Sequence, residues 1–337
     1  MSEMEAERAR ALLCALGDFV RDAVIEGRRE QKTTELARVA RESVADTIYA
    51  IDTLSEEAIV EWLEGHWPAE WPVELVAEGF DEPEMRLFPR GTRLEETRWR
   101  CVVDPIDGTR GIMYDKRPAW VLAGLAPQRG DETRLPDIFV AAMTEIPLTK
   151  QWRADQISAV RGRGLVAEGV DVRTGGREAV QLRRSEARDF LHGFASMVKF
   201  FPAGKTAMAK LEVDLWRSLY GESATEETVI FDDQYISTGG QFHELLAGHD
   251  RMNGDLRPTM LRRAGLRMSL VCHPYDVCTA MLLREAGIIF EKPDGSAVDA
   301  PLDLTSPVEW VAFANETLAE QVRPALRRLL LEGEGGA

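Results

Sequence analysis

Two aspartates three residues apart, Asp104 and Asp107, occupy the hexapeptide Asp104-Pro-Ile-Asp-Gly-Thr109, directly after a predicted strand. Pro105 stiffens the turn and Gly108 permits a positive φ, so both carboxylates should leave the strand end into one small volume. Like charges that close do not ionise together unless a cation lies between them. Because the ligands would be hard oxygens with no histidine or cysteine nearby, the pattern points to Mg²⁺ rather than zinc.

The overall charge of the chain limits which partners it can bind. It has 337 residues with 41 basic and 57 acidic side chains, which leaves a formal charge of −16. Such a chain repels nucleic-acid polymers and anionic membranes, so a phosphorylated substrate needs a local positive source. The backbone amides of Gly108 and Thr109, at the start of a predicted helical turn, would supply one.

The hexapeptide Asp104–Thr109 resembles the first signature of the inositol monophosphatase superfamily, whose members are Mg²⁺-dependent, lithium-sensitive phosphatases. This superfamily includes fructose-1,6-bisphosphatases and 3′(2′),5′-bisphosphate nucleotidases. Upstream, Glu78 ends a predicted strand at a suitable distance, and Asp46 and Asp52 reproduce a family pair of aspartates six residues apart.

The second signature of the family has its counterpart in the segment Pro274–Gly287, which contains Asp276. Tyr275 stands where the family normally has a tryptophan. The matches run from about residue 46 to about residue 318, so the resemblance covers most of the chain. It implies a layered αβαβα sandwich of the sugar-phosphatase type, an α+β or α/β fold.

The resemblance also implies a role for each matched residue. Two or three Mg²⁺ ions would be bound by the carboxylates and one carbonyl oxygen of Glu78, Asp104, Ile106, Asp107 and Asp276. Asp104 would bridge the first two ions. The third, weaker ion would be bound mainly by Glu78, with Asp52 nearby. Catalysis would involve Glu78 and Thr109, with Thr109 polarised by Asp52 to orient and deprotonate the attacking water. The substrate would be held by Asp107, Gly108, Thr109 and Asp276.

The identity of the substrate stays open at this point. The family segment that contacts the inositol ring has no clean counterpart, and Tyr235–Gln241 lies in roughly its place. An acidic residue that contacts a ring hydroxyl would fall on Ser269, and the segment Met252–Leu270 is longer than the usual connection. Inositol phosphate heads the candidates, followed by sugar bisphosphates, nucleotide 3′,5′-bisphosphates and other polyol phosphates. The alternative of another class is a non-catalytic module that binds metal or phosphate.

The elements that must position these residues follow from apolar spacing. Helices are predicted over about 4–30, 36–44 and 55–63, followed by short strands that suggest an antiparallel meander beneath them. From about residue 186 helices and strands alternate, as in an α/β unit. We therefore expect an N-terminal α+β domain over 1–184, carrying most metal ligands, and a C-terminal α/β domain over 185–337, carrying Asp276.

Cysteine usage and hydropathy indicate the cellular compartment that we expect for the protein. Four unevenly spaced cysteines suggest reduced, mostly buried thiols rather than a disulfide framework. No stretch reaches the roughly 18 apolar residues of a membrane span. We expect a cytoplasmic enzyme with a small phosphorylated substrate and no nucleic-acid or membrane partner, and a homodimer is left open.

Overall fold

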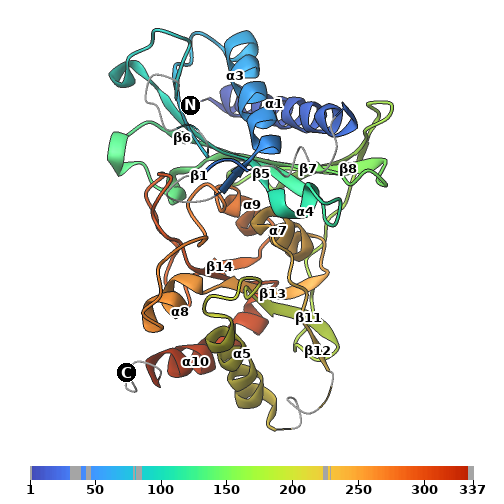
Figure 1. Cartoon of the computed structure of the whole chain (residues 1–337), viewed down its shortest axis with the longest axis vertical. Helices are drawn as coiled ribbons and strands as arrows, with labels where there is room; N and C mark the ends of the chain where they lie inside the picture. Colours follow the sequence, from blue (N-terminus) through green and yellow to red (C-terminus); the bar gives the residue numbers. More distant parts are fainter. Residues whose placement is uncertain are drawn as a thin grey trace.

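The computed structural model describes residues 2–30, 39–42, 47–78, 80, 86–222, 227 and 229–332. These residues form alternating layers of helices and sheets, with the N-terminal helices at one end and the C-terminal helix at the other (Figure 1). The layered αβαβα sandwich predicted from the sequence is confirmed.

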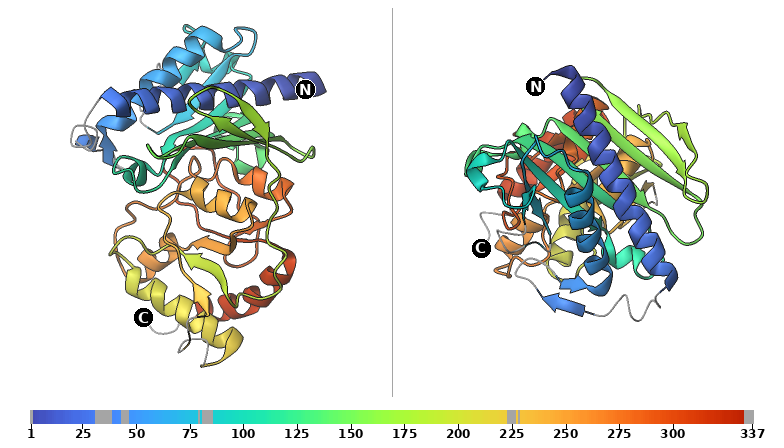
Figure 2. Two further views of the ribbon diagram at one scale, coloured as in Figure 1. Left: turned by 90° about the vertical axis from the view of Figure 1, so that its right-hand side faces the viewer. Right: turned by 90° about the horizontal axis from the view of Figure 1, so that it is seen from above.

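The first layer consists of two helices, α1 (Glu3–Glu30) and α3 (Ala50–His66). Every third or fourth residue of α1 is buried, so one face of the helix packs onto the sheet below (Figure 2). Gly17 lies on this face, and a Cβ added to it would come within 2.2 Å of Thr144 Oγ1 on the sheet. A larger residue at this position would therefore push the helix away from the sheet.

The second layer is an eight-stranded sheet in the order β10-β9-β8-β7-β6-β5-β3-β4. All its neighbouring pairs are antiparallel except β3 and β5, which run parallel. Its strands are β3 Val73–Ala77, β4 Leu87–Phe88, β5 Trp99–Asp107, β6 Ala119–Pro127, β7 Val140–Ile146, β8 Arg153–Val160, β9 Leu165–Asp171 and β10 Arg177–Ala179.

Two helices lie between this sheet and the second one: α7 (Thr238–Leu246) and α9 (Ala280–Glu285). The second sheet has five strands in the order β12-β11-β13-β15-β14 and combines parallel and antiparallel pairs. Its strands are β11 Gly193–Met197, β12 Ile230–Phe231, β13 Asp250–Asp255, β14 Ile289–Glu291 and β15 Trp310–Phe313.

The outer face of the second sheet is covered by α5 (Lys205–Tyr220) and α10 (Glu316–Glu332). Two short helices complete the part of the chain that the structure describes, α4 (Thr109–Ile112) and α8 (Arg257–Arg263). One hydrophobic cluster joins residues of both sheets around α7 and α9. The strand β5 is buried along all nine residues because helices cover both faces of its sheet.

One predicted helix is wrong, and several short elements escaped prediction. Within the expected helix 36–44, residues Val39–Glu42 form strand β1, which pairs antiparallel with β2 (Thr47–Tyr49). The backbone ladder between these two segments replaces helical hydrogen bonds, and residues 31–38 and 43–46 lie outside the described part. The strands β4, β9, β11, β12 and β13 and the helix α8 were not predicted, because such short segments carry little periodic signal.

No helix among the described residues is both long and apolar enough to cross a membrane. All four cysteines are free thiols, and Cys101, Cys272 and Cys278 are buried. The predicted division at residue 184 falls between the last strand of the first sheet and the first strand of the second, and it stays a prediction.

Candidate metal and phosphate site

A bulge in β5 brings Asp104 and Asp107 onto the same side of the sheet. Asp104 pairs with Leu122 on β6 and Asp107 pairs with Trp120, so three steps along β5 match only two along β6. In a regular strand, residues three apart point to opposite faces. The extra residue corrects this alternation, and both carboxylates point into one pocket.

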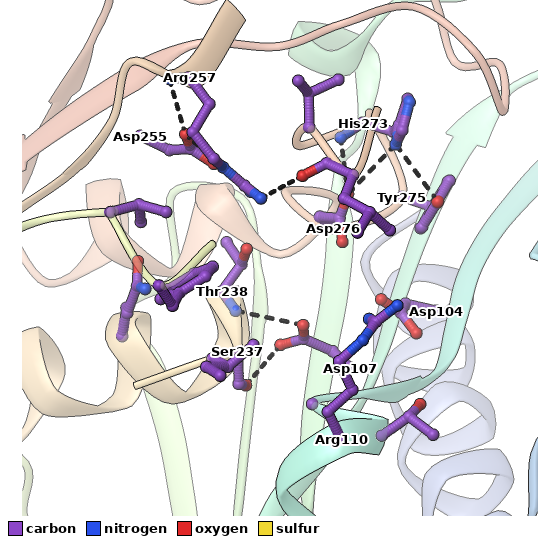
Figure 3. A pocket seen from close by; sticks show the side chains of 18 of the residues that line it. Asp104, Asp107, Arg110, Ser237, Thr238, Asp255, Arg257, His273, Tyr275 and Asp276 are labelled. Carbon is purple, nitrogen blue, oxygen red and sulfur yellow. Dashed lines mark hydrogen bonds and ion pairs between the residues drawn. The ribbon is translucent and has the colours of Figure 1, made fainter. Parts of the chain in front are cut away.

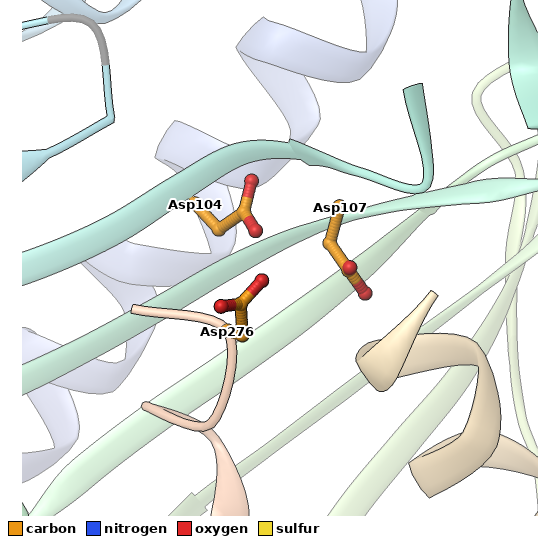
Figure 4. Close-up of side chains that lie close together, drawn as sticks. All are labelled: Asp104, Asp107 and Asp276. Atoms are coloured by element: carbon orange, nitrogen blue, oxygen red, sulfur yellow. The ribbon is translucent and has the colours of Figure 1, made fainter. Parts of the chain in front are cut away.

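Asp276 completes a cluster of three carboxylates from a loop that precedes α9 (Figure 4). Oxygens of Asp104, Asp107 and Asp276 all lie within 4.8 Å of one another. The backbone N–H of His273 donates to Asp276 Oδ2 at 2.6 Å, and the His273 ring stacks on Tyr275 with ring centroids 5.4 Å apart. This turn therefore holds Asp276 over the end of β5.

The cluster is electrostatically unfavourable without a counter-charge. Burial raises the pKa of Asp104 well above its ordinary value, and the charges of Asp107, Glu78 and Asp276 raise it further. Burial also raises the pKa of Asp107 to about 6, although hydrogen bonds from Ser237 and its neighbours partly oppose this rise. A bound cation would remove the repulsion and restore the charged forms.

Asp107 is held by the first turn of α7 (Figure 3). Ser237 Oγ and Gly239 N donate to its Oδ2 at 2.7 and 2.5 Å, and Thr238 N donates to its Oδ1 at 3.1 Å. Ser237 also caps α7, since its Oγ accepts from Gly240 N at 2.8 Å. The segment Tyr235–Gln241 thus contributes to the site mainly by fixing Asp107.

Thr109 and Asp52 meet from different elements. Thr109 Oγ1 lies 3.0 Å from Asp52 Oδ1 and 2.8 Å from the carbonyl oxygen of Ile106. A hydroxyl has one proton, so it donates to only one of these acceptors at a time. Asp52 lies in the first turn of α3, where its Oδ2 accepts from Tyr49 N at 2.7 Å.

The remaining predicted residues line or border the same pocket. Glu78 follows β3 directly and lines the pocket, and so do Ile106 and Gly108. Gly108 has a φ of 98°, and a Cβ added to it would lie 3.0 Å from the Ser237 Cβ. Asp46, the other member of the predicted aspartate pair, lies outside the described residues. The roles assigned to all these residues stay predictions.

The donor set fits a hard divalent cation. It offers carboxylate oxygens from Glu78, Asp104, Asp107 and Asp276, and the Ile106 carbonyl oxygen, without histidine nitrogen or cysteine sulfur among the predicted ligands. Burial raises the pKa of Asp104, and the neighbouring charges of Asp107, Glu78 and Asp276 raise it further, so a cation among these carboxylates would relieve their repulsion. Both features suit Mg²⁺, which prefers oxygen ligands and few direct protein contacts.

The far wall of the pocket holds residues that the sequence did not reveal. Asp255 at the end of β13 and Arg257 at the start of α8 line it, together with the rings of Phe200 and Phe201. Ser269, the position at which an acidic contact was expected, is exposed on the surface instead. Because the connection after β13 is long, counting back from Asp276 led to the wrong position. The charged pair in Asp255-Leu-Arg257, at the end of a strand, was the sequence feature that could have indicated this wall of the pocket.

Comparison by sequence identifies no relative. No protein-family model matches the chain, and no curated protein matches it.

Comparison by structure gives similar folds along nearly the whole chain. SuhB of Mycobacterium tuberculosis is 18% identical, with a TM-score of 0.56, over 97% of this chain and 96% of that one. Fructose-1,6-bisphosphatase of Leishmania major is 13% identical, with a TM-score of 0.63, over 96% and 93%. Inositol monophosphatase of Anabaena is 15% identical, with a TM-score of 0.56, over 97% and 96%. The chain therefore has the fold that these three proteins share, as the resemblance of its motifs implied.

Proposed function

We propose that this chain, which has the fold of inositol monophosphatases and fructose-1,6-bisphosphatases, is a Mg²⁺-dependent phosphomonoester hydrolase. The observation that carries the proposal is the buried cluster of Asp104, Asp107 and Asp276, whose oxygens lie within 4.8 Å of one another. Helix capping or surface solvation does not require three acids from two distant segments, β5 and the loop before α9, at one largely buried point. A site that binds cations does require them.

In this proposal two cations would be held by Glu78, Asp104, the Ile106 carbonyl, Asp107 and Asp276, with Asp104 shared and a third, weaker ion near Glu78. Bound cations supply charge neutralisation of the phosphate and lower the pKa of water. The chain itself contributes the backbone amides of Gly108 and Thr109, which would donate to phosphate oxygens. Asp107 and Asp276 would also contact the substrate.

Thr109 would orient the attacking water and accept its proton. Its hydroxyl has two competing acceptors, Asp52 Oδ1 and the Ile106 carbonyl oxygen. If the Ile106 carbonyl is engaged as a ligand, the Thr109 hydroxyl donates its hydrogen bond to Asp52, and it would pass its own proton to Asp52 as it takes one from the water. The Thr109 oxygen then has its lone pairs directed away from Asp52 and can accept from water. No covalent phosphoenzyme is part of this proposal.

The substrate would be a small phosphorylated polyol. Inositol phosphate stands first, as in an inositol monophosphatase, followed by sugar bisphosphates and 3′(2′),5′-bisphosphate nucleotides. Inhibition by lithium belongs to the same proposal. A non-catalytic module that binds metal or phosphate is the alternative from another class.

A substrate panel tests the proposal. Release of inorganic phosphate is measured for inositol, sugar and nucleotide phosphates with Mg²⁺, with EDTA, and with Mg²⁺ plus lithium. Hydrolysis of at least one compound that EDTA abolishes supports the enzyme. If no compound of the panel releases phosphate and calorimetry shows tight Mg²⁺ binding, the non-catalytic alternative is favoured.

A further inference from the structure

The arginine Arg257 faces the same pocket as the carboxylate cluster. It begins α8, directly after the end of β13, and its side chain is only 14% exposed. Figure 3 shows Arg257 and Asp255 on the opposite side of the pocket from Asp104 and Asp107. The burial of an arginine beside a proposed phosphate-ester site needs a physical reason, because taking its charge out of water is costly.

Asp255 fixes the direction of this guanidinium. Arg257 Nε donates to both oxygens of Asp255 at 2.9 Å, and Nη2 donates to Asp255 Oδ2 at 2.5 Å. Nη1 donates to the carbonyl oxygen of Leu270. The rings of Phe200 and Phe201 lie against the guanidinium, with centroids 5.2 and 5.7 Å from its carbon. The group is therefore rigid before any ligand arrives.

These contacts do not use all the donors of the guanidinium. An arginine has five N–H groups, one on Nε and two on each terminal nitrogen. The hydrogen bonds to Asp255 and Leu270 account for one N–H on each of the three nitrogens. Among the described residues, one N–H on Nη1 and one on Nη2 thus have no protein acceptor. Two donors of this kind match two oxygens of a phosphate or carboxylate.

We propose that Arg257, held by Asp255 and packed against Phe200 and Phe201, binds a second anionic group on the leaving part of the substrate. This inference rests on the proposed function, because it takes the first phosphate to lie at the carboxylate cluster. It narrows the substrate to phosphorylated polyols that carry a further phosphate or a carboxylate. Inositol monophosphate, the first candidate from the sequence motifs, carries no second anion and would then move below the doubly anionic compounds of the same list.

The unused hydrogen-bond donors of Arg257 favour this assignment over a purely structural ion pair. Asp255 alone would balance the charge of Arg257, and a structural pair needs no further donors. Arg257 nevertheless lines the pocket with its donors partly unused. Arginine in a fixed fork is suited to phosphate and carboxylate, whereas lysine offers only a point charge.

Two matched pairs of compounds test the inference. Fructose 1,6-bisphosphate is compared with fructose 1-phosphate, and 6-phosphogluconate with sorbitol 6-phosphate, so that each pair differs in one anion. For the full-length protein with Mg²⁺, kcat/KM and the dissociation constant from calorimetry are measured for all four. We expect at least a tenfold preference for the doubly anionic member of one pair, and the pair concerned tells phosphate from carboxylate.

Three variants separate recognition from folding. Arg257→Lys should lower the preference about tenfold, because the fork is lost while the charge stays. The double variant Asp255→Asn with Arg257→Gln leaves no buried charge unpaired and should also lose the preference. Arg262→Lys, on the exposed side of the same helix, should keep it. Thermal melting checks that each variant folds.

The outcomes distinguish the two proposals. No turnover of any compound, with the affinity preference intact and sensitive to Arg257→Lys, would contradict the hydrolase function and support the anion site. Equal affinities and equal kcat/KM within both pairs would overturn the anion site, and so would a preference that survives in the double variant.

Discussion

Thr109 Oγ1 lies 3.0 Å from Asp52 Oδ1, a contact between residues that are 57 positions apart in the chain. It links the first turn of α3 to the turn that follows β5. Asp52 is itself fixed, because its other oxygen accepts from Tyr49 N at 2.7 Å. This pair therefore connects the N-terminal helix layer to the proposed reacting water.

Removal of the Thr109 hydroxyl should slow the reaction without releasing the cations. Thr109→Ala is expected to lower kcat by about 10²–10⁴, the usual contribution of a positioned proton acceptor. Thr109→Ser should restore most of the rate, because it keeps the hydroxyl. Steady-state kinetics and Mg²⁺ calorimetry check this, and a Thr109→Ala enzyme with an unchanged kcat would contradict the role.

Stabilisation by Mg²⁺ should depend on pH. The pKa of Asp107 is raised to about 6 and that of Asp104 is raised above its ordinary value, mainly by burial. The native state thus holds these protons to higher pH than the unfolded chain, so both groups oppose folding as pH rises above about 4. For Asp107 this loss of stability develops between about pH 4 and about pH 6. Bound cations remove this penalty, and protons compete with them at low pH.

The increase in Tm on adding Mg²⁺ should therefore be larger at about pH 7.5 than at about pH 5. Differential scanning calorimetry with EDTA as the reference measures it. Asp104→Asn should lose most of the increment, while Asp131→Asn, on the exposed surface, should keep it. An increment that is the same at both pH values would show that the cluster does not bind the ion.

Close packing of α7 against β5 and β6 should make Gly239 irreplaceable. A Cβ at Gly239 would lie 2.7 Å from Leu122 Cδ2 and 3.0 Å from Asp107 Oδ2. Gly239→Ala is expected to lower the free energy of unfolding by about 1–3 kcal/mol and to displace Asp107. As the matched control, Gly65→Ala in α3 meets nothing within 4 Å and should stabilise the helix by about 0.5–1 kcal/mol.

Urea unfolding and activity are measured on both glycine variants. If the Gly239→Ala protein loses activity under conditions in which the unfolding curve shows that it is folded, the role of α7 in holding Asp107 is supported. A Gly239→Ala enzyme as stable and as active as the Gly65→Ala control would contradict the packing described here.

The motif Asp104–Thr109 could be found in the sequence because its chemistry is local. Its bulge could not be found, since the extra residue is defined only by the partner strand β6. Arg257 and Asp255 escaped prediction because their pairing depends on where β13 ends within the second sheet. The expected helix over 36–44 was wrong where Val39–Glu42 pairs with a neighbouring strand, a choice that helix propensity does not decide.

The most direct test of the central claim is the Mg²⁺-dependent release of phosphate by Asp104→Asn, compared with the unaltered protein on the best substrate of the panel. Asp104 is 2% exposed and shared by both proposed cations, so the account predicts a rate at least about 10³ lower, with folding retained. An Asp104→Asn enzyme that hydrolyses the same substrate with Mg²⁺ at the original rate would contradict it.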